Sequence, residues 1–195
     1  LTAVTITIRI CMTLEQLHAR GVFHCDVKPL NILITPTNTP ILIDLGAARL
    51  RNEPTPENAV ATIPYSSWEI LYGGTVDGRA DVYSLGMALL HMIVGLPQWV
   101  ESIGEYKDYT TAAVAPRLLQ LQPTPKQLLD YIFQALLNVP YPDLVAPIRK
   151  AIQPHIEDRY QTISEFKRDL VNFLRSQQVT SHLSEQPVIP ERYPD

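Results

Sequence analysis

The sequence predicts a mainly α-helical fold with one small β-hairpin, an α+β domain built round a central buried helix. Residues 81–95 read DVYSLGMALLHMIVG, and a helix that is apolar on every face belongs in the middle of a core. Residues 31–34 and 41–43 are short β-type runs joined by turn chemistry, which predicts the hairpin. At 195 residues the chain is long enough to bury such a core.

The first element expected is a buried helix over residues 5–20. Apolar residues recur along it at helical spacing, namely Ile6, Ile10, Leu14 and Leu17. Gly21 is placed to end this helix with a positive φ. The stretch 24–31, HCDVKPLN, should then be a loop, because Pro29 suits neither a regular helix nor a central strand.

The predicted hairpin places polar side chains beside that loop. Asn31 stands at the start of one strand and Asp44 at the end of the other, so both can converge beside Asp26. With Lys28, the group comprises two carboxylates, one ammonium and one carboxamide, which is what phosphoryl transfer to a hydroxyl requires. The alternative is that Asn31 and Asp44 are merely turn residues, and the presence of Asp26 and Lys28 at this spacing argues against it.

The remainder of the chain predicts further helices separated by proline-rich stretches. Residues 46–61 are polar and should be exposed, and Asp81 is expected to cap the N-terminus of the central helix, which Gly95 ends. Further helical patterns cover residues 126–137, 144–152 and 163–174. We therefore expect one lobe over residues 1–175, followed by a flexible tail over residues 176–195.

Composition excludes several classes of protein. The net charge of −4 and the pI near 5.7 argue against a nucleic-acid surface, and no apolar run approaches the length of a membrane span. The two cysteines, Cys11 and Cys25, show no metal-ligand spacing and fit a reducing compartment, which indicates a cytoplasmic location. The chain begins at Leu1 without a methionine, so we expect a piece of a longer protein.

Ordered motifs then point to a family. HCDVKPLNILI, IDLG, ATIPYSSWE, DVYSLG and EDRYQTISEF resemble the C-terminal lobe of eukaryotic-type protein kinases, close to the bacterial serine/threonine kinases. The resemblance spans residues 6–174, and motifs in the right order and spacing are more specific than any one of them alone. It implies a serine/threonine protein kinase that transfers phosphate from ATP, with Mg²⁺ or Mn²⁺, to a protein substrate.

The resemblance also implies roles for particular residues. Asp26 matches the catalytic aspartate that orients the attacking hydroxyl, and Lys28 matches the lysine that steadies the transferring phosphoryl group. Asn31 and Asp44 match the two magnesium ligands. Thr62 matches the threonine of the substrate-facing loop, and together with Lys28 it favours serine or threonine acceptors over tyrosine.

Other matches are structural. His24 matches a histidine that packs rather than reacts, Glu69 and Arg159 match a buried ion pair, and Asp81 matches the helix-capping aspartate that fixes the catalytic loop. We expect Glu69, Arg159 and Asp81 to be buried. Cys25 replaces the arginine that pairs with a phosphorylated activation segment in many kinases, so regulation by that electrostatic route is not expected.

One part of the kinase pattern is missing from the sequence. All eight glycines lie from Gly21 onward and none forms a G-x-G-x-x-G loop, so the resemblance implies that the small N-terminal lobe is absent. The chain by itself is then expected to be inactive. Turnover would require the missing lobe, or a partner that supplies it. A catalytically silent kinase-like binding or scaffold protein is one alternative. A small-molecule phosphotransferase of the aminoglycoside kinase type is another, which Lys28 and the segment 62–69 argue against.

Overall fold

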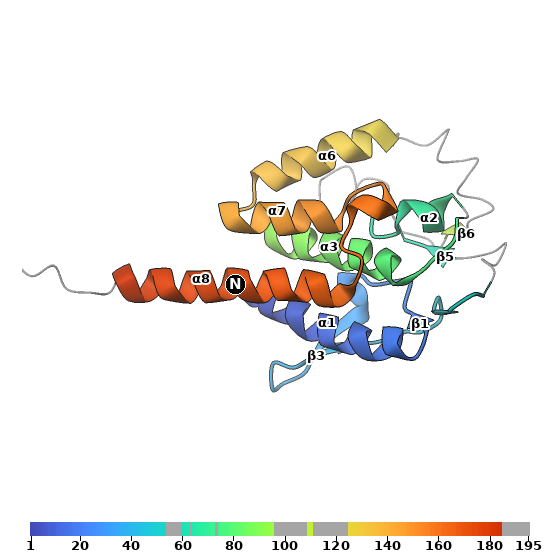
Figure 1. The fold of residues 1–195 in the computed structure, drawn as a ribbon, viewed down its shortest axis with the longest axis horizontal. Helices are drawn as coiled ribbons and strands as arrows, with labels where there is room; N and C mark the ends of the chain where they lie inside the picture. The colour runs from blue at the N-terminus through green and yellow to red at the C-terminus, as the bar shows by residue number, and fades with distance from the viewer. Residues whose placement is uncertain (54–59, 63, 73, 96–108, 111–124, 185–195) are drawn as a thin grey trace, which may run out of the picture.

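The computed structural model describes residues 1–53, 60–62, 64–72, 74–95, 109–110 and 125–184 (Figure 1). In these ranges the α-helices are α1 (Thr2–Ala19), α2 (Trp68–Leu71), α3 (Gly78–Val94), α6 (Pro125–Leu137), α7 (Pro142–Ala151) and α8 (Ile163–Ser184). The strands are β1 (Val22–Phe23), β2 (Ile32–Ile34), β3 (Pro40–Leu42), β4 (Arg49–Leu50), β5 (Val60–Ala61) and β6 (Tyr109–Thr110). They form antiparallel pairs, β1 with β4, β2 with β3 and β5 with β6. The prediction of a mainly helical fold is confirmed. The described residues contain two further two-stranded antiparallel pairs besides the one predicted hairpin.

The helix α3 is the centre of the core, as its composition predicts. Every residue from Ala80 to Leu90 is buried, and α3 packs against α1, α6, α7 and α8. Figure 1 shows α3 lying between α7 on one side and the pair α1 and α8 on the other. Among the described helices, none is both long and apolar enough to cross a membrane.

The crossing of α3 and α7 depends on Gly86. A Cβ atom at this position would lie 2.8 Å from the Cβ of Ala151 and 2.8 Å from Cγ2 of Ile152. These distances are shorter than real carbon contacts, so only glycine permits the two helices to approach this closely.

Gly86→Ala should therefore destabilise the fold although alanine is the better helix former. Overpacking typically costs about 1–3 kcal/mol, which exceeds the gain of roughly 1 kcal/mol in helix propensity. Urea unfolding of the native full-length protein measures the change, and Asn172→Ala on the exposed face of α8 serves as the control, with an expected change within about 0.5 kcal/mol. Equal or higher stability of Gly86→Ala would show that the helices are not packed this tightly.

The elements that lead to the site agree with the sequence to within a few residues. Helix α1 begins at Thr2 rather than at residue 5, and Gly21 follows its end with φ of 72° as predicted. The predicted hairpin is β2 with β3, in which Leu33 lies opposite Ile41.

The prediction that Asp81 caps α3 is wrong. The helix begins one turn earlier, at Gly78, and its N-cap is Asp77, whose side chain accepts a hydrogen bond of 2.9 Å from the Arg79 amide. Asp81 lies in the first turn, fully buried, because its carboxylate binds another part of the chain. Gly95 ends the helix with φ of 81° as predicted.

The prediction of a flexible tail from residue 176 is wrong for residues 176–184, which continue α8. Residues 163–184 contain neither proline nor glycine, and the first proline after Ile163 is Pro187, so nothing in this stretch breaks the helix. Residues 185–195 lie outside the described residues, as does most of the stretch 96–124. The predicted helices over 126–137 and 144–152 are present as α6 and α7.

Candidate active site

Polar side chains from two distant segments meet around the carboxylate of Asp26. Asp26 Oδ2 lies 2.8 Å from Lys28 Nζ and accepts a hydrogen bond of 2.9 Å from Asn31 Nδ2. Asp26 Oδ1 accepts a hydrogen bond of 2.9 Å from the hydroxyl of Thr62, and Lys28 Nζ donates to the same hydroxyl at 2.9 Å. The structure therefore brings Asp26, Lys28, Asn31 and Thr62 into one largely buried network.

The local backbone holds this network in place. Pro29 begins a single turn of 3₁₀ helix, Pro29–Asn31, in which the Asn31 amide donates to Lys28 O at 2.9 Å. Asn31 Nδ2 also donates to the carbonyl oxygen of Asp26 at 2.8 Å. The Ile43 amide donates to Asn31 O at 2.9 Å and ties the loop to the hairpin.

Asp44 is placed differently from the other candidate residues. It follows β3 with φ of 68°, is exposed, and its Oδ1 accepts a hydrogen bond of 3.0 Å from the Gly46 amide. The structure thus places Asp44 at the end of the hairpin, outside the hydrogen-bonded network of Asp26.

The oxygen atoms of Asn31 and Asp44 suit a hard cation. Because Asn31 uses its nitrogen to bind Asp26, its Oδ1 accepts no hydrogen bond from the residues that the structure describes. The Asp44 carboxylate is open to solvent. A carboxamide oxygen and a carboxylate are ligands that Mg²⁺ accepts, with waters and phosphate oxygens completing its coordination. The donor set therefore fits the ion.

The carboxylate of Asp81 fixes the backbone just before Asp26. Asp81 Oδ2 accepts a hydrogen bond of 2.9 Å from the His24 amide, and Oδ1 accepts one of 2.8 Å from the Cys25 amide. Cys25 has φ of 64°, a left-handed conformation that is costly for a residue with a side chain. These two hydrogen bonds stabilise that conformation.

His24 and Cys25 are themselves buried. His24 Nε2 lies 3.1 Å from the carbonyl oxygen of Ile43, so Nε2 donates and Nδ1 is left to accept from the Asp26 amide at 3.3 Å. Burial raises the pKa of the Cys25 thiol, the negative charge of Asp81 raises it further, and the positive charge of Arg49 opposes the shift. The thiol therefore stays protonated, and both side chains have packing contacts rather than exposed reactive atoms.

The predicted pair of Glu69 and Arg159 is present. Arg159 Nη1 and Nη2 donate to the two carboxylate oxygens of Glu69 at 2.7 and 2.9 Å. The Arg159 side chain is 0% exposed and that of Glu69 11%, so Glu69 is partly rather than fully buried. Arg159 also donates to the carbonyl oxygens of Gln153 and Pro154 at 2.7 and 2.9 Å. The pair links α2, which begins six residues after Thr62, to the segment before α8.

The sequence did not indicate an exposed apolar face beside the site. Leu33 lies opposite Ile41 across the hairpin, and Ile43 follows on the same face. Their exposed fractions are 52%, 46% and 36%. The alternation of strand side chains could have predicted this face, because Ile32 and Leu42 point to the core instead. Ile34, at the end of β2, departs from the alternation and is also exposed. The backbone joins this face to Asn31, because the Ile43 amide donates to Asn31 O at 2.9 Å.

Comparisons with known proteins identify similar sequences. The family model described as the protein kinase domain matches residues 2–181. The probable serine/threonine-protein kinase PknB of Corynebacterium glutamicum is 32% identical over 200 residues, which cover 99% of this chain and 29% of that protein. PknB of Mycobacterium leprae is 34% identical over 87% of this chain and 26% of its own length. PknB of Mycobacterium tuberculosis is 35% identical over 83% of this chain. The chain thus spans less than a third of the length of these relatives.

Proposed function

This chain belongs to the protein kinase domain family, and on that premise we propose that it carries the large catalytic lobe of a serine/threonine protein kinase. The reaction is transfer of the γ-phosphoryl group of ATP to a serine or threonine hydroxyl of a protein. The names of its relatives, which are serine/threonine-protein kinases, support this acceptor class.

The position of the Thr62 hydroxyl carries the proposal. This hydroxyl lies 2.9 Å from both the Asp26 carboxylate and the Lys28 ammonium, so the site already accommodates an alcohol between a base and a cation. An acceptor hydroxyl needs the same two neighbours, one to take its proton and one to balance charge on the phosphoryl oxygens.

The proposed roles follow from these contacts. Asp26 orients the acceptor hydroxyl and takes its proton as the new oxygen–phosphorus bond forms and the bond to the leaving ADP breaks. Lys28 balances the negative charge on the transferring group. Asn31 and Asp44 would hold Mg²⁺ or Mn²⁺, which when bound supplies positive charge to the ATP phosphates.

The exposed apolar face of Leu33, Ile41 and Ile43 supports a nucleotide site. An aromatic base laid on these side chains would remove apolar surface from water, at roughly 25 cal/mol per Å². The sequence contains no glycine-rich phosphate loop, so we infer that another segment of the protein or a partner covers the phosphates. On this proposal the 195 residues alone do not turn over ATP.

Regulation is proposed to differ from that of many kinases. Cys25 is buried and its thiol uncharged, so it offers no positive charge to a phosphorylated activation segment.

A kinase-like protein that binds without catalysis is the second candidate, because the same apolar hairpin face could be covered by a protein partner. Calorimetric titration of the native full-length protein with ATP and Mg²⁺ separates the two candidates. Saturable binding favours the kinase, and absence of binding favours the silent protein.

Transfer is expected to require a divalent cation held by Asn31 and Asp44. Chelation with EDTA should abolish the transfer of labelled γ-phosphate to protein acceptors by the native full-length protein. Asp44→Ala should raise the Mg²⁺ concentration for half-maximal rate by about 10- to 100-fold or more. Asp143→Ala, which removes an exposed carboxylate on α7, is the control and should leave this concentration unchanged. Undiminished transfer in EDTA would contradict the proposal.

A further inference from the structure

The turn that carries Thr62 is joined to the central helix by a tyrosine and a histidine. The amides of Tyr65 and Ser66 both donate to the carbonyl oxygen of Thr62, at 2.8 and 2.9 Å. The Tyr65 hydroxyl is hydrogen-bonded to Nδ1 of His91 on α3, and the centroids of the two rings lie 5.9 Å apart. Because the Thr62 hydroxyl binds Asp26, one short turn connects the proposed catalytic carboxylate with His91.

One nitrogen of the His91 ring remains available to a ligand. Burial lowers the pKa of His91 below its ordinary value, because it disfavours the charged form, so the imidazole is neutral at neutral pH. A neutral imidazole has one donor and one acceptor nitrogen. The Tyr65 hydroxyl donates to Nδ1, and Nε2 therefore carries the hydrogen. Nε2 forms no hydrogen bond with the residues that the structure describes, yet it is not one of their buried polar atoms without a partner. Its N–H therefore faces solvent.

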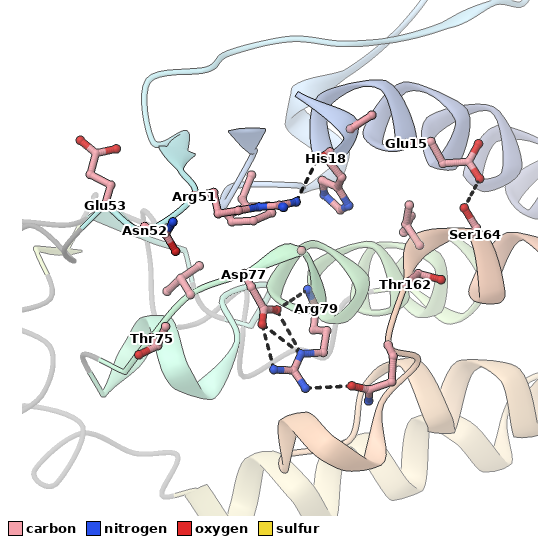
Figure 2. Close-up of a pocket in the computed structure, with 16 residues that line it drawn as sticks. Glu15, His18, Arg51, Asn52, Glu53, Thr75, Asp77, Arg79, Thr162 and Ser164 are labelled. Atoms are coloured by element: carbon pink, nitrogen blue, oxygen red, sulfur yellow. Dashed lines mark hydrogen bonds and ion pairs between the residues drawn. The ribbon is translucent and has the colours of Figure 1, made fainter. Parts of the chain in front are cut away.

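The surroundings of His91 leave this N–H free of a competing anion. Within the described part of the chain, no carboxylate, ammonium or guanidinium group is paired with the ring, and Tyr65 is the titratable group bonded to it. Charged side chains gather instead around a cavity of about 600 Å³ at the end of α1, the turn after β4 and the starts of α3 and α8 (Figure 2). Gly78 lines that cavity, and His91 lies thirteen residues further along α3, about 20 Å of helix away.

An acceptor protein must approach this same turn. Its hydroxyl has to reach Asp26, whose carboxylate already binds the Thr62 hydroxyl, so the residues that flank the acceptor hydroxyl lie along the turn 62–66. Tyr65 joins that turn to His91. A carboxylate accepts a hydrogen bond from an imidazole N–H, and such a charge-assisted bond is roughly twice as strong as a bond between neutral groups.

We propose that His91 determines acceptor specificity, because its Nε2 donates a hydrogen bond to an aspartate or glutamate side chain that flanks the acceptor hydroxyl. The proposal rests on the proposed function for the reaction, whereas recognition of the acidic side chain can be measured without catalysis. When His91 takes up a proton, Nδ1 donates to the Tyr65 oxygen and Nε2 keeps its hydrogen. The ring then stays in place and gains a positive charge, so selectivity for acidic acceptors rises as the pH falls through the pKa of His91.

The kinetic test uses synthetic peptides with a single threonine and the native full-length protein. Paired peptides differ only in carrying aspartate or asparagine at one position, scanned over about three residues on each side of the threonine, because extended residues advance roughly 3.3 Å each. At the best position, kcat/KM should favour the aspartate peptide by about 3- to 10-fold near pH 8, and by more near pH 5.5 as His91 becomes charged. Both peptides meet the same Asp26, so titration of that group cancels in the ratio.

Two substitutions at position 91 separate the effect of charge from that of packing. His91→Gln still offers hydrogen-bonding groups but cannot gain charge, so the ratio should no longer change with pH. His91→Glu places a negative charge at this position and should reverse the preference, with the asparagine peptide favoured over the aspartate peptide. His155→Gln and His155→Glu change an exposed histidine and are the matched controls, which should leave the wild-type ratio and its pH dependence unchanged.

The second readout is binding of the same peptides with alanine in place of threonine, measured as Kd in the absence of ATP. The ratio of the two Kd values should follow the same pattern with pH and with each substitution. Equal affinity for aspartate and asparagine peptides at every position would overturn the proposal, as would a preference that does not grow at low pH or that survives in His91→Glu. The pH dependence of the wild type needs no variant, so it decides the matter even if a variant fails to fold. If the wild type phosphorylates none of the peptides, the proposed function fails while the Kd ratio still decides the role of His91.

Discussion

Replacing Asp26 with asparagine is expected to lower kcat for phosphoryl transfer by about 10²- to 10⁴-fold while the protein stays folded. The asparagine side chain has nearly the same shape, and its single carbonyl oxygen can still accept the hydrogen bond from Asn31. Its amide nitrogen would then face the Thr62 hydroxyl and donate to it, where the Asp26 carboxylate accepts from it. Asparagine cannot take the proton of the acceptor hydroxyl, and it no longer forms the 2.8 Å ion pair with Lys28. The loss should appear in kcat rather than in the KM for ATP.

The measurement is a steady-state assay on the native full-length protein, paired with thermal unfolding of each variant. Asp158→Asn is the matched control, because Asp158 is an exposed aspartate in the turn before Arg159. Its kcat should equal that of the wild type. If the kcat of Asp26→Asn equalled that of this control, Asp26 would have no part in the reaction.

Replacing Arg159 with methionine should cause the largest loss of stability, about 3–5 kcal/mol. The substitution leaves the Glu69 carboxylate, 11% exposed, without its bidentate partner. It also leaves the carbonyl oxygens of Gln153 and Pro154 without their donor. Denaturant unfolding of the native full-length protein should show this as a lower midpoint with an unchanged slope.

Two further variants separate a buried pair from an ordinary surface charge. Arg168→Met removes an exposed arginine that lies 3.9 Å from Asp169 and should change stability by about 0–1 kcal/mol. The double variant Glu69→Leu with Arg159→Met should recover much of the loss, because no buried charge is left without a partner. A single Arg159→Met variant as stable as Arg168→Met would mean that the pair does not hold the segment before α8.

The parts of the site that are close in sequence could be predicted, because the conformation of one short segment of backbone determines their positions. Asp26, Lys28 and Asn31 lie within one short loop, and the proline at position 29 sets its turn. The uniform apolarity of α3 likewise predicted its central position. For Thr62, the sequence suggested a place beside the catalytic loop only through the family resemblance, since its partner Asp26 is 36 residues away.

The role of Asp81 shows why the remainder could not be predicted. Asp77 and Asp81 both lie near the start of α3, and an aspartate at either position could cap the helix. Which of the two aspartates caps the helix depends on the amides of His24 and Cys25. These amides lie more than 50 residues away in the chain and donate hydrogen bonds to Asp81, which leaves Asp77 as the cap. The hydrogen bond between His18 and Asp81 also joins residues far apart in the chain. Nothing in the sequence indicated it, because a histidine in the last turn of a helix is already favourable there.

The most direct test of the central claim is the identity of the residue that receives the phosphate. The native full-length protein is incubated with Mg²⁺ and ATP labelled at the γ-phosphate, together with protein acceptors, and the labelled amino acids are identified after hydrolysis. We expect phosphoserine or phosphothreonine with the wild type and almost none with Asp26→Asn. Label that persists unchanged in Asp26→Asn, or a wild type that binds ATP and Mg²⁺ but labels no acceptor and not itself, would contradict the account.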